Sequence, residues 1–116
     1  MFTANGAATG NNFDLGIYTF GGVKLASSGS TAQSGTNVIQ SVTVSCTLSP
    51  GTYYMACAFN GTTSTLIKNS SPTVAQFRIA GILKQDTAFA LPATATFVAT
   101  DAFYLPLFGL SGRSTI

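Results

Sequence analysis

The sequence contains no histidine, no glutamate and no tryptophan, and charged residues of either sign are scarce. Its 116 residues include five Lys or Arg and three Asp or Glu, so that 7% are charged, against about 25% in an ordinary soluble domain. Histidine and carboxylate side chains perform most proton transfers and bind most metal ions in proteins. We therefore expect a protein that is not an enzyme and that has no catalytic residues, cofactor or metal ion.

The basic side chains are too dispersed for nucleic-acid binding. They occur singly at Lys24, Lys68, Arg78, Lys84 and Arg113, whereas a nucleic-acid interface needs a dense cationic face. We expect no nucleic-acid partner.

Neither a targeting segment nor a membrane span is expected. The first twelve residues have no cationic region and no apolar core, unlike a signal peptide. The most apolar stretch, 88–110, is interrupted by Pro92, Asp101 and Pro106 and is rich in threonine, which favours strands and excludes membrane insertion.

Hydroxyl groups supply the polarity that charges supply elsewhere. The chain has 12 Ser and 17 Thr, a quarter of its residues, beside 46% apolar residues and a mean hydropathy of +0.37. The length is that of one domain, so we expect a single domain over 1–116, with 1–11 an extended N-terminal arm and 105–116 a docking tail. Because a monomer with so few charges tends to associate, we expect neighbouring chains to cover its surface.

Short strands separated by turn residues account for the sequence pattern, and no segment has the periodicity of a helix. At 42–48, apolar residues alternate with Ser and Thr, and 52–59 is apolar on both faces. We predict an all-β fold, an antiparallel β-sandwich or jelly roll of seven to nine short strands. The expected strands are 13–18, 23–27, 42–48, 52–59, 62–67, 74–79, 81–84, 94–100 and 102–107.

Glycine, proline and asparagine mark the turns between these strands. Gly21-Gly22 and Asn60-Gly61 predict hairpins, because their residues tolerate positive φ. The segment 27–37 is a polar loop, and Ser49-Pro50-Gly51 interrupts the chain between two strands.

The two cysteines, Cys46 and Cys57, fall at apolar positions of their strands. If 42–48 and 52–59 form a hairpin, the sulfurs are diagonal neighbours and too far apart to bond. If the turn between them is an arch between two sheets, a disulfide becomes feasible. We favour buried, reduced thiols. Asp14 is interpreted as a turn-forming residue that opens a strand, with a cation site as the weaker alternative.

Thirteen aromatic rings are present, nine Phe and four Tyr. Most Phe fall at inward-facing positions and are expected in the core. Tyr18, Tyr54 and Tyr104 are candidate exposed contacts for a sugar or a partner subunit.

Several sequence segments resemble the small β-sandwich modules of tailed-phage virion proteins, found in tail fibres, tail tips and head-attached accessory proteins. These segments are Asp14-Leu-Gly-Ile-Tyr18, Gly22-Val-Lys-Leu-Ala-Ser27, the SGSTAQSGT loop and Leu48-Ser-Pro-Gly-Thr-Tyr-Tyr54. Their order is also similar to that of the pre-peptidase C-terminal jelly roll of secreted bacterial enzymes. The resemblance spans about residues 13–59. It implies a structural corner at Pro50, Gly51 and Tyr53, in which the tyrosine hydroxyl pins the arch between two strands.

The resemblance implies a non-enzymatic virion structural protein of a tailed phage, a homo-oligomer on the tail fibre, tail tip or capsid. Its partners are then copies of itself and other virion proteins, and its location is the virion, assembled in the host cytoplasm. The segment 105–116, with Arg113, is expected to dock on neighbours. The alternative is a carbohydrate-binding module that recognises a host-surface glycan.

Overall fold

The computed structural model describes residues 2–5, 11–61, 65–66, 68–69, 73–99 and 105–111. These residues form a mostly β structure in which every strand pairing is antiparallel, which confirms that part of the fold prediction. The elements are β1 (Phe2–Asn5), β2 (Asn12–Thr19), β3 (Lys24–Ser27), β4 (Thr31–Ala32), β5 (Ile39–Gln40), β6 (Tyr53–Phe59), β7 (Thr65–Leu66), β8 (Lys68–Asn69), α1 (Val74–Ile79), β9 (Leu83–Lys84), β10 (Val98–Ala99) and β11 (Leu105–Pro106).

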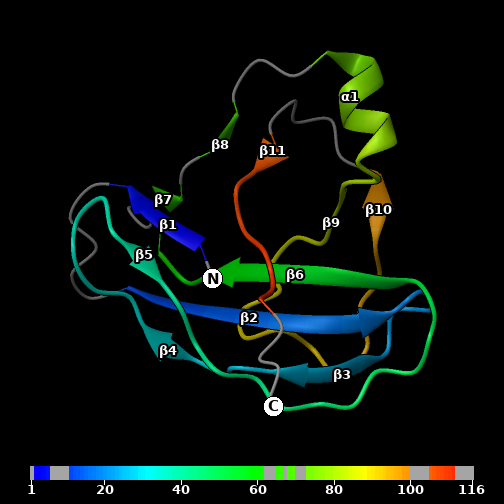
Figure 1. Cartoon of the computed structure of the whole chain (residues 1–116), viewed down its shortest axis with the longest axis horizontal. Coiled ribbons are helices and arrows are strands. Elements are labelled where there is room, and N and C mark those ends of the chain that lie inside the picture. The colour runs from blue at the N-terminus through cyan, green and yellow to red at the C-terminus, as the bar shows by residue number, and fades with distance from the viewer. Residues whose placement is uncertain are drawn as a thin grey trace.

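Strand β2 is the centre of the largest sheet (Figure 1). It pairs with β6 without interruption from Phe13↔Phe59 to Thr19↔Tyr53. Its other edge is shared by β3, which pairs near the end of β2, and β4, which pairs near its start. Six consecutive residues of β2, from Phe13 to Tyr18, are buried, so this strand is covered on both faces.

The predicted hairpin at Gly21-Gly22 connects β2 to β3. The Thr19 N–H donates to the Val23 carbonyl at 2.9 Å, and the Gly22 N–H donates to the Thr19 carbonyl at 3.0 Å. Gly22 has φ +83°, a conformation that costs glycine little because it has no Cβ.

One face of the central sheet carries the apolar core. Phe13 and Leu15 form its buried centre, and Val42, Cys57, Phe59 and Phe108 pack against them. Phe108 belongs to the segment expected as a docking tail, and here it contributes to the core of its own chain.

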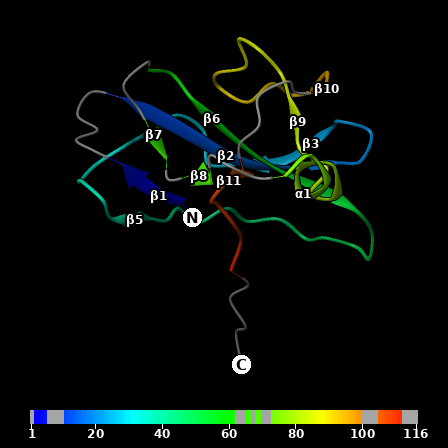
Figure 2. The same ribbon diagram turned by 90° about the horizontal axis from the view of Figure 1, so that it is seen from above.

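The predicted strand 42–48 is wrong, because this segment has no strand partner. Its alternation persists at the start, where Val42 and Val44 are half-buried and Ser41 and Thr43 are exposed. The segment runs beside one face of the sheet on its way from β5 to β6 (Figure 2), and Val42 packs there against the buried Phe13 and Leu15. The hairpin alternative for the two cysteines is therefore wrong as well.

The predicted strand 74–79 is also wrong, because these residues form the helix α1. Thr73 and Gln76 make a capping box, in which the Gln76 N–H donates to the Thr73 hydroxyl at 3.2 Å and the Thr73 N–H donates to the Gln76 side-chain oxygen at 2.9 Å. Gly81, with φ +61°, follows the helix. The capping signal was present in the sequence, but six residues are too few to show helical periodicity.

Smaller pairings surround the central sheet. Strand β1, expected within a free arm, lies between β5 and β7. The expected return strand at 62–67 is not confirmed as a partner of β6, because its described part, β7, pairs with β1. Strand β9 pairs with β10, and β8 pairs with β11, which places short strands within the predicted ranges 81–84, 94–100 and 102–107. Strand β4 lies within the expected loop 27–37.

Replacing Gly16 by alanine should destabilise the fold by about 1–3 kcal/mol, because an added methyl group overpacks a closed site. A Cβ at Gly16 would lie 2.7 Å from Leu91 Cδ1 and 3.0 Å from the Ala26 carbonyl oxygen. Gly21→Ala is the matched control, since its Cβ meets nothing nearer than 3.9 Å. Urea unfolding of the two variants measures the difference, and equal midpoints would contradict the packing described for Gly16.

Candidate functional site

The second face of the central sheet is closed by residues 91–95, which we call the strap. Asp14 of β2 is completely buried on this face. One oxygen of its carboxylate accepts the Leu91 N–H at 3.0 Å, and the other accepts the Ser28 hydroxyl at 3.2 Å. Asp14 thus fixes the start of the strap, which agrees with neither the turn-forming role nor the cation site considered from the sequence.

Three further hydrogen bonds, with Lys24 and Gly22, hold the strap along the sheet. The Lys24 ammonium donates to the Leu91 carbonyl at 2.6 Å, and the Lys24 N–H donates to the Ala93 carbonyl at 2.9 Å. At the far end, the Ala95 N–H donates to the Gly22 carbonyl at 2.8 Å. The strap therefore bonds to β2, to β3 and to the turn between them.

The sequence predicts that Tyr18 is an exposed contact, and this prediction is wrong. Its side chain is completely buried beneath the strap. Its hydroxyl donates to the Pro92 carbonyl at 2.6 Å. Burial raises the pKa of this hydroxyl, and the negative charge of Asp14 raises it further. Tyr18 is a structural residue that orders the strap.

Tyr54 lies in an aromatic cluster beside the end of the strap. It neighbours Tyr18 across the β2–β6 ladder. Its ring stacks on Phe20 with a centroid separation of 5.5 Å and an interplanar angle of 15°, and it meets the edge of Phe97 at 5.1 Å. Phe97 also packs edge-on against Tyr18 at 5.6 Å. Rings from three distant parts of the chain thus meet at one place.

These rings surround the candidate functional site, a hollow of about 280 Å³ that we call the aromatic pocket. Its described lining is apolar or glycine, with Tyr54 as the one residue that carries a polar side-chain group. The lining residues are Phe20, Gly21, Gly22, Tyr54, Leu83, Ala95 and Phe97. Phe20 is 68% exposed, so a ring face is accessible at the rim. The pocket can stack a flat apolar surface, and it offers no charged group to a reaction.

The corner at Pro50, Gly51 and Tyr53 joins the 41–48 segment to β6. The Tyr53 hydroxyl donates to the Ser49 carbonyl at 2.6 Å, the type of contact that the resemblance implies for this tyrosine. A Cβ at Gly51 would lie 3.4 Å from the Tyr53 hydroxyl oxygen. Glycine at this position therefore leaves space for the Tyr53 ring to lie over the turn. Pro50 is exposed.

The remaining predicted residues have varied outcomes. Tyr104 and Arg113 lie outside the described residues. Cys46 and Cys57 are both free thiols; Cys46 is exposed, contrary to the expected burial, and Cys57 lies partly buried beside the apolar core.

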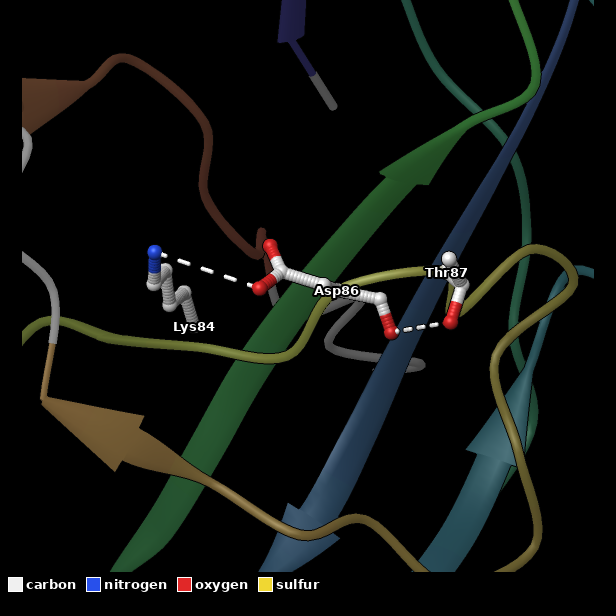
Figure 3. A network of polar contacts seen from close by, with 3 residues as sticks. All are labelled: Lys84, Asp86 and Thr87. Carbon is white, nitrogen blue, oxygen red and sulfur yellow. Dashed lines mark hydrogen bonds and ion pairs between the residues drawn. The ribbon is translucent and has the colours of Figure 1, made fainter.

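Charged residues form no other candidate site in the described ranges. No group of three or more His, Cys, Asp or Glu side chains there is close enough to hold a metal ion. Lys84 and Asp86 approach to 4.0 Å, and the Thr87 hydroxyl donates to the Asp86 carbonyl at 2.8 Å (Figure 3). Because the two charged side chains are 38% and 81% exposed, solvent screens this pair and it contributes little to stability.

None of the helical residues that the structure describes builds a helix of the length and apolarity needed to span a membrane.

Compared with family models, with curated proteins and with solved structures, the chain gives no match in any of the three.

The two thiols should differ strongly in reactivity. Burial raises the pKa of Cys57 from 9.0 to about 11, which lowers its thiolate fraction near neutral pH about a hundredfold, and the thiolate is the reactive form. Cys46 is exposed and should react first. Timed alkylation followed by mass spectrometry measures this, with Cys46→Ser and Cys57→Ser as matched controls.

The same shift predicts a pH dependence of stability. Since the folded-state pKa of Cys57 lies above the ordinary value, the protonated thiol contributes stability that is present below pH 9 and is lost as the pH rises toward 11. Cys57→Ser should weaken that loss, which urea unfolding at several pH values measures.

For the alkylation experiment, equal rates for both thiols in the native protein would contradict the burial of Cys57.

Proposed function

We propose that the protein is a non-enzymatic structural subunit that assembles with copies of itself, and that the assembly is part of a tailed-phage virion. The single observation that carries the assembly is the apolar surface. Twelve large apolar side chains are exposed within the described residues, against five that are buried. The exposed ones are Phe20, Val23, Leu25, Val38, Ile39, Leu48, Met55, Ile79, Leu83, Val98, Leu107 and Leu110.

Burial of these side chains between subunits would remove them from water. Transfer of one large apolar side chain from water is worth about 1.5–3 kcal/mol. Ile39 and Ile79 are 70% and 86% exposed, so most of that free energy remains available for association. With a net charge of +2 over 116 residues, electrostatic repulsion between copies is weak.

The virion location and the sandwich fold are parts of the same proposal. The location rests on the resemblance of residues 13–59 to phage modules. The sandwich is supported by the antiparallel pairing and by the central sheet, whose two faces are covered by the 41–48 segment and the strap. Partners are copies of the chain and other virion proteins.

Assembly predicts an oligomer at micromolar concentrations in sedimentation velocity and light scattering. Because the association buries apolar surface, added salt should not dissociate it. Cross-linking of intact particles, with mass spectrometry of the linked peptides, then identifies the neighbouring chains. A monomer at every concentration, indifferent to virion proteins, would refute the proposal.

A second candidate function is favoured by the aromatic pocket, namely recognition of a host-surface glycan. Sugar rings stack on exposed aromatic faces, and Phe20 offers such a face beside Tyr54. Tyr54 lines the pocket, and its hydroxyl is the group to which a sugar would hydrogen-bond. A receptor-binding subunit would combine this function with assembly.

The glycan function predicts hits on a glycan array and a loss of affinity of about tenfold or more in Phe20→Ala. Phe20 is mostly exposed, so its removal should leave the fold intact. Ile79→Ala, which removes a still more exposed apolar side chain from α1, is the control. An array without hits would end the glycan alternative.

A further inference from the structure

The outer edge of β6 is where the structure points to a specific contact. The direction of the backbone groups along β2 is fixed by two hydrogen bonds on its opposite side. The Leu15 carbonyl accepts the Ser28 N–H at 2.8 Å, and the Thr19 N–H donates to the Val23 carbonyl at 2.9 Å. Because backbone groups alternate in direction along a strand, the even-numbered residues of β2 direct theirs toward β6.

Because the pairing of β2 with β6 is uninterrupted, the direction of the backbone groups on β6 follows from that on β2. The even-numbered residues of β2 pair with Tyr54, Ala56 and Ala58. The N–H and C=O groups of the residues between them, Tyr53, Met55 and Cys57, therefore point away from β2. Within the described residues, no other strand pairs with β6, and none of these residues gives the outward groups a backbone partner.

This edge lacks the features that keep natural sheet edges from pairing. Such edges are usually protected by lysine, proline or a bulge, or by being very short. The β6 sequence, YYMACAF, has seven residues without charge, proline or glycine, and its pairing with β2 has no bulge. Met55, at its middle, is 45% exposed.

We propose that β6 pairs antiparallel with β6 of a second copy, across a twofold axis at Met55. Met55 then exchanges hydrogen bonds with Met55 of the partner subunit, and Tyr53 exchanges them with Cys57 of the partner subunit. All the outward groups of these three residues are satisfied, and the two central sheets become one. This inference rests on the self-assembly proposed above and names one surface that carries it.

A second copy fits this edge because the strand is complementary to itself. In this register Tyr54 lies opposite Ala56 of the partner subunit, and Tyr53 lies opposite Cys57 of the partner subunit, so that each large ring faces a small side chain. No charged side chain on β6 opposes its own copy.

The test measures the association of the whole chain and of two lysine variants by sedimentation velocity. Met55→Lys places two like charges at the twofold axis, so the dissociation constant should rise about a hundredfold or more. Thr43→Lys adds the same charge at an exposed position away from the edge and should associate like the original chain. Circular dichroism confirms that both variants are folded.

Amide hydrogen exchange gives a second measurement, in which the unaltered chain is compared with the Met55→Lys variant. In the assembly, the amides of Tyr53, Met55 and Cys57 should exchange as slowly as those of their neighbours Tyr54 and Ala56. In the folded Met55→Lys monomer, the amides at 53, 55 and 57 should exchange fast while those at 54 and 56 stay protected. This alternating pattern follows from pairing at the edge and not from a general loss of structure.

The outcomes separate this inference from the proposed function. If the chain associates but its outward β6 amides exchange fast, or if Met55→Lys associates unchanged, the edge pairing is wrong and assembly uses another surface. If the chain is monomeric at every concentration, the edge pairing and the proposed self-assembly are both wrong. A strand from a different protein would then be the remaining partner for the β6 edge.

Discussion

The fold depends on a carboxylate that has been taken out of water. Asp14 lies in the central strand, fully buried, and burial of a charge is costly unless hydrogen bonds replace its hydration. Its donors are the Ser28 hydroxyl beyond β3 and the Leu91 N–H, 77 residues away in the sequence. Charge-assisted bonds of this kind are stronger than neutral ones. Asp14 needs both hydrogen bonds, and one of them comes from the strap. The strap must therefore lie over this face of the sheet for Asp14 to be buried there.

The aromatic pocket is a consequence of the same coupling. The strap carries the chain past Gly22 to Phe97, and the β2–β6 register places Tyr54 beside Tyr18. Phe20 is presented by the tight turn at the end of β2. The pocket wall is thus assembled from segments that meet where the strap lies against the sheet, so a change at Asp14 would alter an aromatic pocket built from other residues.

Local patterns in the sequence predicted the parts of the structure that local interactions determine. The strands at β2 and β6 and the turn at Gly22 follow from alternation and from glycine's conformational freedom. The alternation at 42–48 correctly indicates which side chains, such as Val42, face inward. It does not show whether the segment has a strand partner, because alternation depends on a buried face and not on backbone pairing. The cap at Thr73 precedes the short segment VAQFRI, whose β-branched Val and Ile favour a strand over a helix. The burial of Tyr18 and the role of Asp14 require the strap, a long-range contact that no local pattern contains.

The scarcity of charge acquires a structural meaning from these contacts. Among the few charged residues, Asp14 and Lys24 bond to the two backbone groups of Leu91, so they serve the interior and do not make the surface more soluble. Hydroxyl side chains keep the exposed chain polar, as at Ser41 and Thr43, but they do not repel a second copy as charges do. An uncharged, regular edge such as β6 is ordinarily selected against in a monomer. Its presence in this chain supports the proposal that a second copy covers the β6 edge.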